Sequence, residues 1–355
     1  MERGRPRPQQ VRNEKRHFDS FSFMKCLVVT ICFLSCLGSQ AVVEPATGDA
    51  RAWKRYQSAG EKALKAKDSL EAERQFALAV AEAEKIRKGE GKLRESLDDL
   101  APLLVNHRKY EQAQAAFERL RVLYANDLGS NHIRVAECLL GLGHAYAYSK
   151  KLFEAEEAFL EARRIVGRKP TENYAAMIQV RNSLAFVNAQ QGRNAEAEAL
   201  YVSAIEMAER PRVEYRRRAN GAVEEIRYTP PYQLLGGMRN DLGLLYAAQD
   251  RWAEAEESFK RAQRMFQTGF GKESSGVALS LGNLGHAYLK QKKFSEAEDA
   301  LGQALAIREK AFAPNHPILA DTLELLAAAQ KQRNPELAET TLKRAQQIRA
   351  ATPTQ

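Results

Sequence analysis

Residues 142–159 read LGHAYAYSKKLFEAEEAF, and this stretch decides the fold because the chain repeats it. Residues 284–301 read LGHAYLKQKKFSEAEDAL, and residues 242–259 read LGLLYAAQDRWAEAEESF. A pattern that returns at a fixed interval of about 40 residues is typical of a solenoid, in which each repeat packs only against its neighbours.

A small residue opens the second half of each copy and sets the period. It occurs seven times, at intervals of 41, 42, 42, 58, 42 and 41 residues: Ala72, Ala113, Ala155, Ala197, Ala255, Ala297 and Ala338. A bulky residue stands four places later in every copy: Phe76, Phe117, Phe159, Tyr201, Phe259, Leu301 and Leu342. A further apolar residue follows three places after that. Spacings of four and seven lie on one face of a helix, where the small residue lets a second helix approach and the large one fills the adjacent hollow.

This pattern resembles the tetratricopeptide repeat, in the 42-residue variant found in kinesin light chains and many bacterial proteins. The resemblance covers roughly residues 51–349, and the loop signature of the variant is matched by Pro314-Asn315-His316-Pro317 and more weakly by Ser130-Asn131-His132. The resemblance implies an all-α fold, an α-solenoid formed as a right-handed superhelix of antiparallel helix hairpins, with about seven repeats and about fourteen helices. The first, second and seventh copies are degenerate, with Ala101 and Leu326 at the glycine position of the second and seventh.

The N-terminus carries the features of a secretory signal peptide. Lys25 precedes twelve uncharged, mainly apolar residues, 26–37, and small residues at Ser39 and Ala41 suggest cleavage after Ala41. This apolar stretch is shorter than the roughly 20 residues of an ordinary spanning helix. We therefore expect an exported protein, periplasmic or secreted. The alternatives are retention of residues 26–37 as a membrane anchor, or a lipid anchor.

The expected organisation follows from the repeats and the leader. Residues 1–41 are expected to be a basic leader plus signal peptide, with Met24 as the true start, and residues 42–50 a linker. Repeats one to four are expected to span residues 51–209, and repeats five to seven residues 233–349. Residues 210–232 between them are expected to be a basic insertion rich in Pro and Arg, and residues 350–355 a tail.

The net charge gives little support for a nucleic-acid partner. The chain has 54 Lys and Arg and 45 Asp and Glu, a net charge of +9. Removal of residues 1–41 takes away seven basic and three acidic residues and leaves 47 and 42, so the excess falls to +5. So small and dispersed an excess does not indicate a nucleic-acid or membrane surface.

The insertion explains the 58-residue interval. Pro211 is expected to end one helix, and Pro230-Pro231 suit the start of the next. Between them the sequence predicts a loop whose basic residues could contact an acidic partner or could simply be solvated: Arg212, Arg216, Arg217 and Arg218.

The sequence shows no catalytic constellation. It lacks a P-loop, a Gly-x-Ser-x-Gly elbow, a Cys-x-x-Cys and a His-Glu-x-x-His motif. His144 and His286 occupy equivalent places three repeats apart, too far to share a metal ion. Cys138 is expected to be a small buried apolar residue. We therefore predict no enzyme, no cofactor and no metal site.

The resemblance also implies where a partner would bind. In the repeat family the positions three before, one after and four after the glycine of the first helix line a concave groove. A partner could be gripped by asparagine amides, which both donate and accept hydrogen bonds, and by apolar side chains. On this chain the candidate groove residues are Leu140, His144, Asn182, Phe186, Asn240, Leu244, Asn283, His286 and Leu289.

The leading hypothesis is a non-catalytic scaffold that binds a protein or extended peptide in this groove. Its asparagines are expected to face solvent in the free protein. The alternative is a structural or assembly component of a cell-envelope complex, which would use the outer edges and the basic insertion. Glu61, Glu95 and Asp98 in repeats one and two would repel a terminal carboxylate, so the sequence does not favour a carboxylate clamp in that half of the groove.

Overall fold

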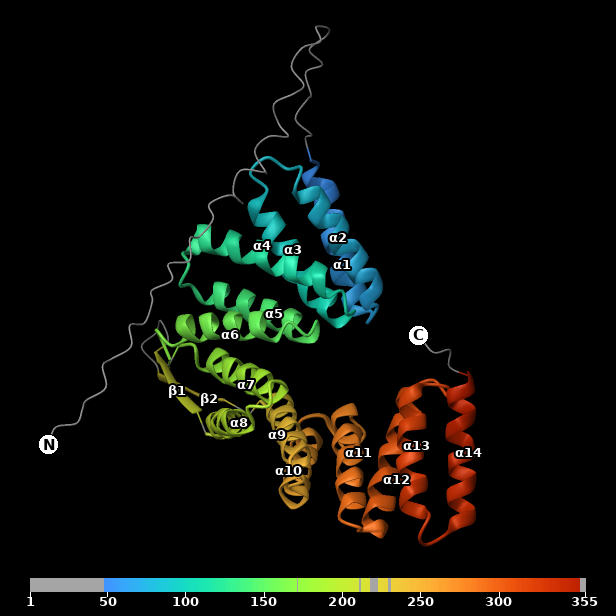
Figure 1. Ribbon diagram of the computed structural model, residues 1–355. Helices are drawn as coiled ribbons and strands as arrows, with labels where there is room; N and C mark the ends of the chain where they lie inside the picture. Colours follow the sequence, from blue (N-terminus) through green and yellow to red (C-terminus); the bar gives the residue numbers. More distant parts are fainter. Residues whose placement is uncertain (1–47, 171, 211, 218–222, 229–230, 352–355) are drawn as a thin grey trace, which may run out of the picture. The chain divides into compact units, whose positions relative to one another are not determined.

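The computed structural model describes residues 48–170, 172–210, 212–217, 223–228 and 231–351 (Figure 1). Over these residues the fold is all-α, with fourteen helices and one small β-hairpin. The helices and strands are α1 Ala50–Lys65, α2 Ser69–Ala83, α3 Glu90–Asn106, α4 Tyr110–Leu128, α5 Ile133–Tyr148, α6 Leu152–Val166, α7 Tyr174–Gln190, α8 Asn194–Glu209, β1 Arg212–Arg217, β2 Val223–Tyr228, α9 Tyr232–Ala247, α10 Trp252–Phe270, α11 Ser275–Lys290, α12 Phe294–Ala311, α13 Pro317–Gln330 and α14 Pro335–Ala351.

Each repeat forms a hairpin of two helices, and the hairpins follow one another in sequence order from α1 to α14 (Figure 1). The first helix of a repeat packs on the second helix of the same repeat, and that second helix packs on the next hairpin. Successive first helices also contact one another, as α5 with α7 and α7 with α9 do. The first helices therefore share one side of the stack, which we call the first-helix face: α1, α3, α5, α7, α9, α11 and α13.

The alternation of small and large residues forms the core of each hairpin, as the sequence predicts. Ala155 and Phe159 are both fully buried on α6. The Phe159 ring lies directly against Gly143 on α5, where an added Cβ would come within 2.4 Å of the ring. Equivalent contacts join glycine and the bulky residue in repeats one, five and six. A glycine in the first helix thus allows the close helix crossing that buries the ring.

The seventh repeat departs from this prediction. Leu342 on α14 is 41% exposed, although its equivalents in the other six repeats are at most 9% exposed. The hairpin of α13 and α14 has a neighbouring repeat on one side only among the described residues. Terminal repeats in a solenoid leave part of their packing surface open in this way.

A residue in the left-handed backbone region joins the two helices of most repeats. Lys67, Arg108, Lys150, Gly192, Asp250 and Lys292 have φ between 56° and 76°, and they recur with the period of the repeat. This conformation reverses the chain just after the first helix, and glycine adopts it with least strain. The turn is therefore fixed by backbone geometry shared by six repeats, although only one of them uses glycine.

Histidines begin two of the first helices. His132 Nδ1 accepts a hydrogen bond of 3.2 Å from the Arg134 N–H, and His316 Nδ1 accepts one of the same length from the Ile318 N–H. Both side chains thus satisfy a backbone donor that the helix itself leaves unpaired. These are the histidines of the two loop signatures, which accordingly mark helix starts.

The insertion contains secondary structure where the sequence predicts a loop. Strands β1 and β2 pair antiparallel, with Arg212 opposite Tyr228 and Arg217 opposite Val223. In β1 the β-favouring residues Val213 and Tyr215 alternate with charged ones, which is compatible with such a hairpin. The buried core continues past this hairpin, because Tyr201 on α8 and Met238 on α9 belong to one hydrophobic cluster.

Within the described part of the chain, every helix is too short or too polar to span a bilayer. The leader, the signal peptide and the tail residues 352–355 lie outside the described residues, as do the first six residues of the linker.

Candidate functional site

Three cavities open along the first-helix face between repeats four and six. The largest encloses about 630 Å³ between α7 and α9, and a second of about 510 Å³ lies between α9 and α11. The two share Gln233, Gly237 and Phe270. A third, of about 150 Å³, shares Asp241 with the largest. The shared residues make these cavities one continuous run of hollows rather than isolated holes.

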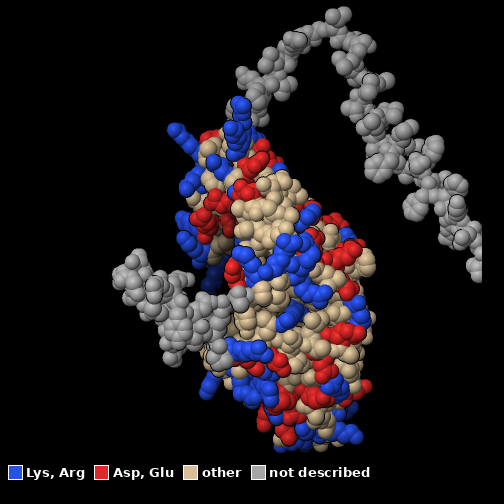
Figure 2. Space-filling model, turned by 90° about the vertical axis from the view of Figure 1, so that its left-hand side faces the viewer, with Lys and Arg blue, Asp and Glu red and all other residues tan. Residues whose placement is uncertain are grey.

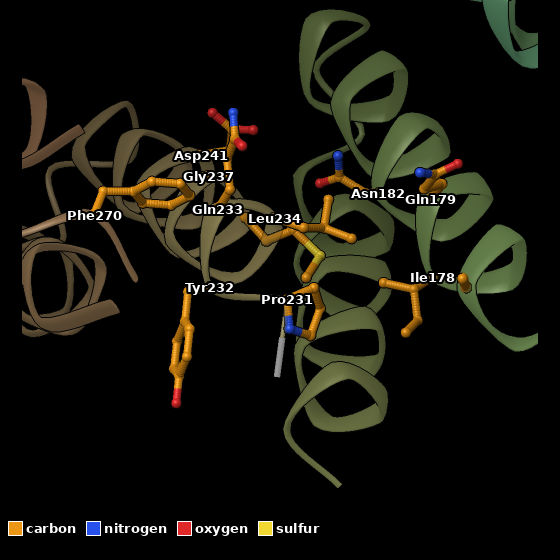
Figure 3. A pocket seen from close by; sticks show the side chains of 12 residues that line it. Ile178, Gln179, Asn182, Pro231, Tyr232, Gln233, Leu234, Gly237, Asp241 and Phe270 are labelled. Atoms are coloured by element: carbon orange, nitrogen blue, oxygen red, sulfur yellow. The ribbon is translucent and has the colours of Figure 1, made fainter. Parts of the chain in front are cut away.

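The largest cavity has an apolar floor with polar groups at its edge (Figure 3). Ile178 on α7 and Met238 on α9 are buried beneath it, and Phe270 from the end of α10 is 54% exposed beside it. Asn182 and Asp241 come from the two facing helices, and both lie in the upper part of the view in Figure 3. Apolar walls with a few polar groups are typical of a ligand-binding cleft.

An aromatic strip runs along the first-helix side of repeats two to four. The Tyr110 and Tyr148 rings lie 5.9 Å apart, and the Tyr148 and Phe186 rings lie 6.2 Å apart with their planes at 61°. We call Tyr110, Tyr148 and Phe186 the aromatic strip. Tyr148 is 50% exposed, and Leu244, which lines the 150 Å³ cavity with Phe186, is 47% exposed. Large apolar side chains that remain accessible in this way often mark an interaction site.

Several predicted groove residues are accessible as expected. Phe186 and Leu244 share a cavity. His286 is exposed, with its ring edge-on to Trp252 at 5.7 Å. Leu289 is half-buried and packs against the core. These side chains come from α7, α9 and α11, so the structure brings them to one face.

His144 is held more tightly than an open groove residue would be. Its Nε2 shares a hydrogen bond of 2.8 Å with Ser183 Oγ on α7, and its ring lies edge-on to Phe159 at 5.2 Å. Burial lowers the pKa of His144 to about 4, so the ring is neutral at physiological pH. His144 therefore joins two first helices.

The prediction that Leu140 and Asn240 line the accessible surface of the groove is wrong. Leu140 is 5% exposed and belongs to the core, and Asn240 is 3% exposed. Asn240 Oδ1 accepts a hydrogen bond of 2.8 Å from Asn283 Nδ2 on the next first helix. Neighbouring first helices pack closely enough to cover the position three residues before the glycine. The expectation that the three asparagines face solvent is wrong for Asn240, and Asn182 and Asn283 are only partly exposed.

The basic residues of the insertion lie mostly on a strand. Arg212, Arg216 and Arg217 are part of β1, and Arg218 is outside the described residues. Cys138, predicted to be buried, is a free thiol with 4% exposure, and burial raises its pKa to about 12.

Sequence reasoning missed Tyr110, Tyr148 and Asp241. Tyr148 stands four residues after His144, one turn along the same helix face, and this spacing could have indicated it. Asp241 occupies the same place in its repeat as Asn283, two residues before the glycine. Tyr110 opens a second helix, and only the folded hairpin brings it to the strip.

The described residues show no group of three or more side chains arranged to hold a metal ion. Their charges are intermingled: Figure 2 shows Lys and Arg beside Asp and Glu over the face in view, with uncharged areas between them. The site therefore offers apolar contact and isolated polar groups.

Comparison with known proteins agrees with the repeat assignment. The family model described as Tetratricopeptide repeat matches residues 136–210 and 235–310, which are repeats three and four and repeats five and six. A search of curated proteins gave no match.

Solved structures share the fold. BtubC (BKLC) from P. vanneervenii is similar with 20% sequence identity and a TM-score of 0.50, over 75% of this chain and 95% of that chain. The apo form of RapI is similar with 15% identity and a TM-score of 0.59, over 85% of this chain and 77% of that chain. The family match over residues 136–210 and 235–310, the repeat period and the stacked hairpins show that the chain contains tetratricopeptide repeats, a fold typical of protein-interaction scaffolds.

Proposed function

We propose that this protein binds an extended peptide segment of a protein partner along the first-helix face of repeats three to five, without catalysis. The observation that carries the proposal is the accessible row formed by Tyr148, Phe186 and Leu244 on successive first helices. Aromatic side chains that are rigid and partly exposed supply much of the binding energy in protein interfaces.

The shape of the site supports an extended segment as the bound form. The cavities follow one another along α7, α9 and α11 and share residues at their borders. An extended peptide advances about 3.3 Å per residue and presents alternate side chains to one side. Such a segment could place successive side chains in successive hollows.

A peptide selection tests this proposal. Nonapeptides selected from a random display library on the full chain would be resynthesised and titrated by calorimetry. We expect Tyr148→Ala and Phe186→Ala each to weaken binding by about tenfold or more, as truncation of interface aromatics does. The matched control is Val202→Ala, because Val202 is an apolar residue, 37% exposed, on the second helix α8.

The opposite pattern would contradict the proposal. If Val202→Ala weakens binding and the two aromatic variants bind at full strength, the outer edges carry the interaction. The envelope-assembly alternative would then be the better account.

We also propose that the protein acts after export. The support comes from residues 25–41, which the sequence marks as a signal peptide and which lie outside the described residues. N-terminal sequencing of protein from its native host should begin at Val42. A soluble cytoplasmic form that starts at Met1 or Met24 is incompatible with export.

A further inference from the structure

Two side-chain pairs join neighbouring first helices in the same register. Between α1 and α3, Gln57 Nε2 donates a hydrogen bond of 2.6 Å to Asp99 Oδ2. Between α9 and α11, Asn283 Nδ2 donates one of 2.8 Å to Asn240 Oδ1. Each pair links the position three residues before the glycine site of one repeat to the position two residues before that site in the next. The register follows from the repeat itself.

At the junction between α7 and α9, Asn182 and Asp241 occupy the equivalent two positions, and the insertion separates them in sequence. Here the pair is not made. Asn182 Oδ1 is buried without a hydrogen-bond partner. The Asp241 carboxylate forms neither a hydrogen bond nor an ion pair within the part of the chain that the structure describes. Both residues instead line the 630 Å³ cavity.

An unsatisfied buried acceptor on Asn182 and a partly buried carboxylate on Asp241 lie beside an apolar cavity, and together they indicate what would fit there. A buried acceptor without a partner costs about 1–3 kcal/mol, and more when it is charged. Burial raises the pKa of Asp241 to about 6, so the carboxylate is mainly ionised at neutral pH. A ligand with at least two hydrogen-bond donors satisfies both groups, and a positive charge on that ligand also pairs with the ionised carboxylate.

The surroundings favour an amino-acid side chain as that ligand. Lysine has three donors and arginine five, each at the end of an apolar stem. The stem matches the apolar lining from Ile178, Met238 and Phe270. A carboxylate ligand would be repelled by Asp241, and a purely apolar side chain would leave both acceptors unpaired.

Acidic side chains also gather around Asp99 on the first helices of repeats one and two, where Arg134 pairs with Asp98. Burial raises the pKa of Asp99, and the charges of Asp98, Glu61 and Glu95 raise it further. A cationic peptide is therefore complementary to the face beyond the cavity as well.

We propose that the cavity between α7 and α9 binds a lysine or arginine side chain of the extended peptide, with Asp241 and Asn182 as its acceptors. This inference rests on the proposed function and specifies its partner as a basic peptide. The insertion separates the two repeats that form the cavity, and both positions of the register carry polar side chains there.

The test uses the peptides selected on the full chain. Each binder would be resynthesised with its lysines replaced singly by norleucine, or its arginines by citrulline, which remove the charge at similar size. We expect one such replacement to weaken binding to the unmodified protein by about tenfold or more. Asp241→Asn should weaken binding of the cationic peptide equally and should abolish the difference between the two peptides. Asp299→Asn, an exposed acid on the second helix α12, is the matched control and should change nothing.

Three results would overturn the inference, and they separate it from the proposed function. If Asp241→Asn leaves the preference for lysine or arginine intact while Tyr148→Ala weakens binding, the groove is used but this cavity is not the cation site. If neither variant affects binding, both proposals fail. A selection that returns no binder contradicts both as well.

Discussion

Phe159 shows how much of the fold depends on a single repeat position. Its ring is fully buried against Gly143, whereas Leu342, at the same place in the last repeat, is 41% exposed. We expect Phe159→Ala to lower the free energy of unfolding by about 3–5 kcal/mol, because the lost contacts leave a cavity. Leu342→Ala should cost about 1 kcal/mol or less, since much of its surface already contacts water. Urea denaturation followed by circular dichroism measures both, and similar losses would mean that the terminal repeat is packed differently.

Asp241 is a residue whose burial opposes folding. Burial raises its pKa to about 6 from the ordinary 3.8, so the native state binds the proton more tightly than the unfolded chain does. The stability of the protein should therefore fall as the pH rises from about 4 to about 6 and stay lower above that. Burial and the charge of Asp241 together raise the pKa of Tyr148 and of Tyr201, so both tyrosines remain neutral across this range.

The substitution Asp241→Asn removes the free-energy cost of burying an ionised carboxylate. We expect the variant to be more stable than the unmodified protein at pH 7 by roughly 1–3 kcal/mol, with a smaller difference at pH 4. Denaturation at the two pH values measures the difference. A variant that is less stable at pH 7 would show that the carboxylate has a cationic partner in the free protein.

For single residues, the sequence predicts which side chains form the core better than it predicts which side chains line the candidate binding site. The sequence identifies the core positions, such as Ala155 and Phe159, because they recur at the period of the repeat. Asn240 could not be distinguished from Asn182 in the same way, because both stand three residues before the glycine site. Their difference arises from the next repeat: Asn283 donates a hydrogen bond to Asn240 Oδ1, whereas Asn182 Oδ1 has no hydrogen-bond partner.

At the scale of the element, the turn inside each repeat carries a backbone requirement that the side chains do not reveal. Lys150 and Gly192 occupy the same turn position with φ of 66° and 76°. We expect Lys150→Gly to stabilise the protein by up to about 1 kcal/mol, because glycine adopts this conformation without strain. Gly192→Ala should destabilise it by a similar amount. Thermal unfolding of the two variants measures both, and shifts in the same direction would contradict the argument.

The insertion is the element that the sequence predicted least well. Its prolines, its arginines and the break in the repeat period suggested a loop. The backbone nevertheless pairs as β1 and β2 between α8 and α9. Strand pairing depends on two segments meeting in register, which a single stretch of sequence does not specify.

At the scale of the whole molecule, the period predicted the stack of hairpins and the first-helix face. It could not predict the open junction between α7 and α9, because a solenoid's period describes what successive repeats share. The cavity arises where the repeat is interrupted, and the unpaired Asn182 and Asp241 are visible only once the neighbouring pairs are seen. We therefore expect the binding site to lie where the insertion interrupts the repeats.

Photocrosslinking tests the central claim, that an extended peptide binds along the first-helix face, most directly. A photoreactive benzoylphenylalanine would replace Gln190, an exposed residue that lines the 150 Å³ cavity, or Val202 on α8 as the control. With a selected, labelled peptide bound, we expect a covalent product from position 190 and none from position 202. A product from position 202 alone would contradict the account, because the peptide would then lie on the opposite helices of the hairpins.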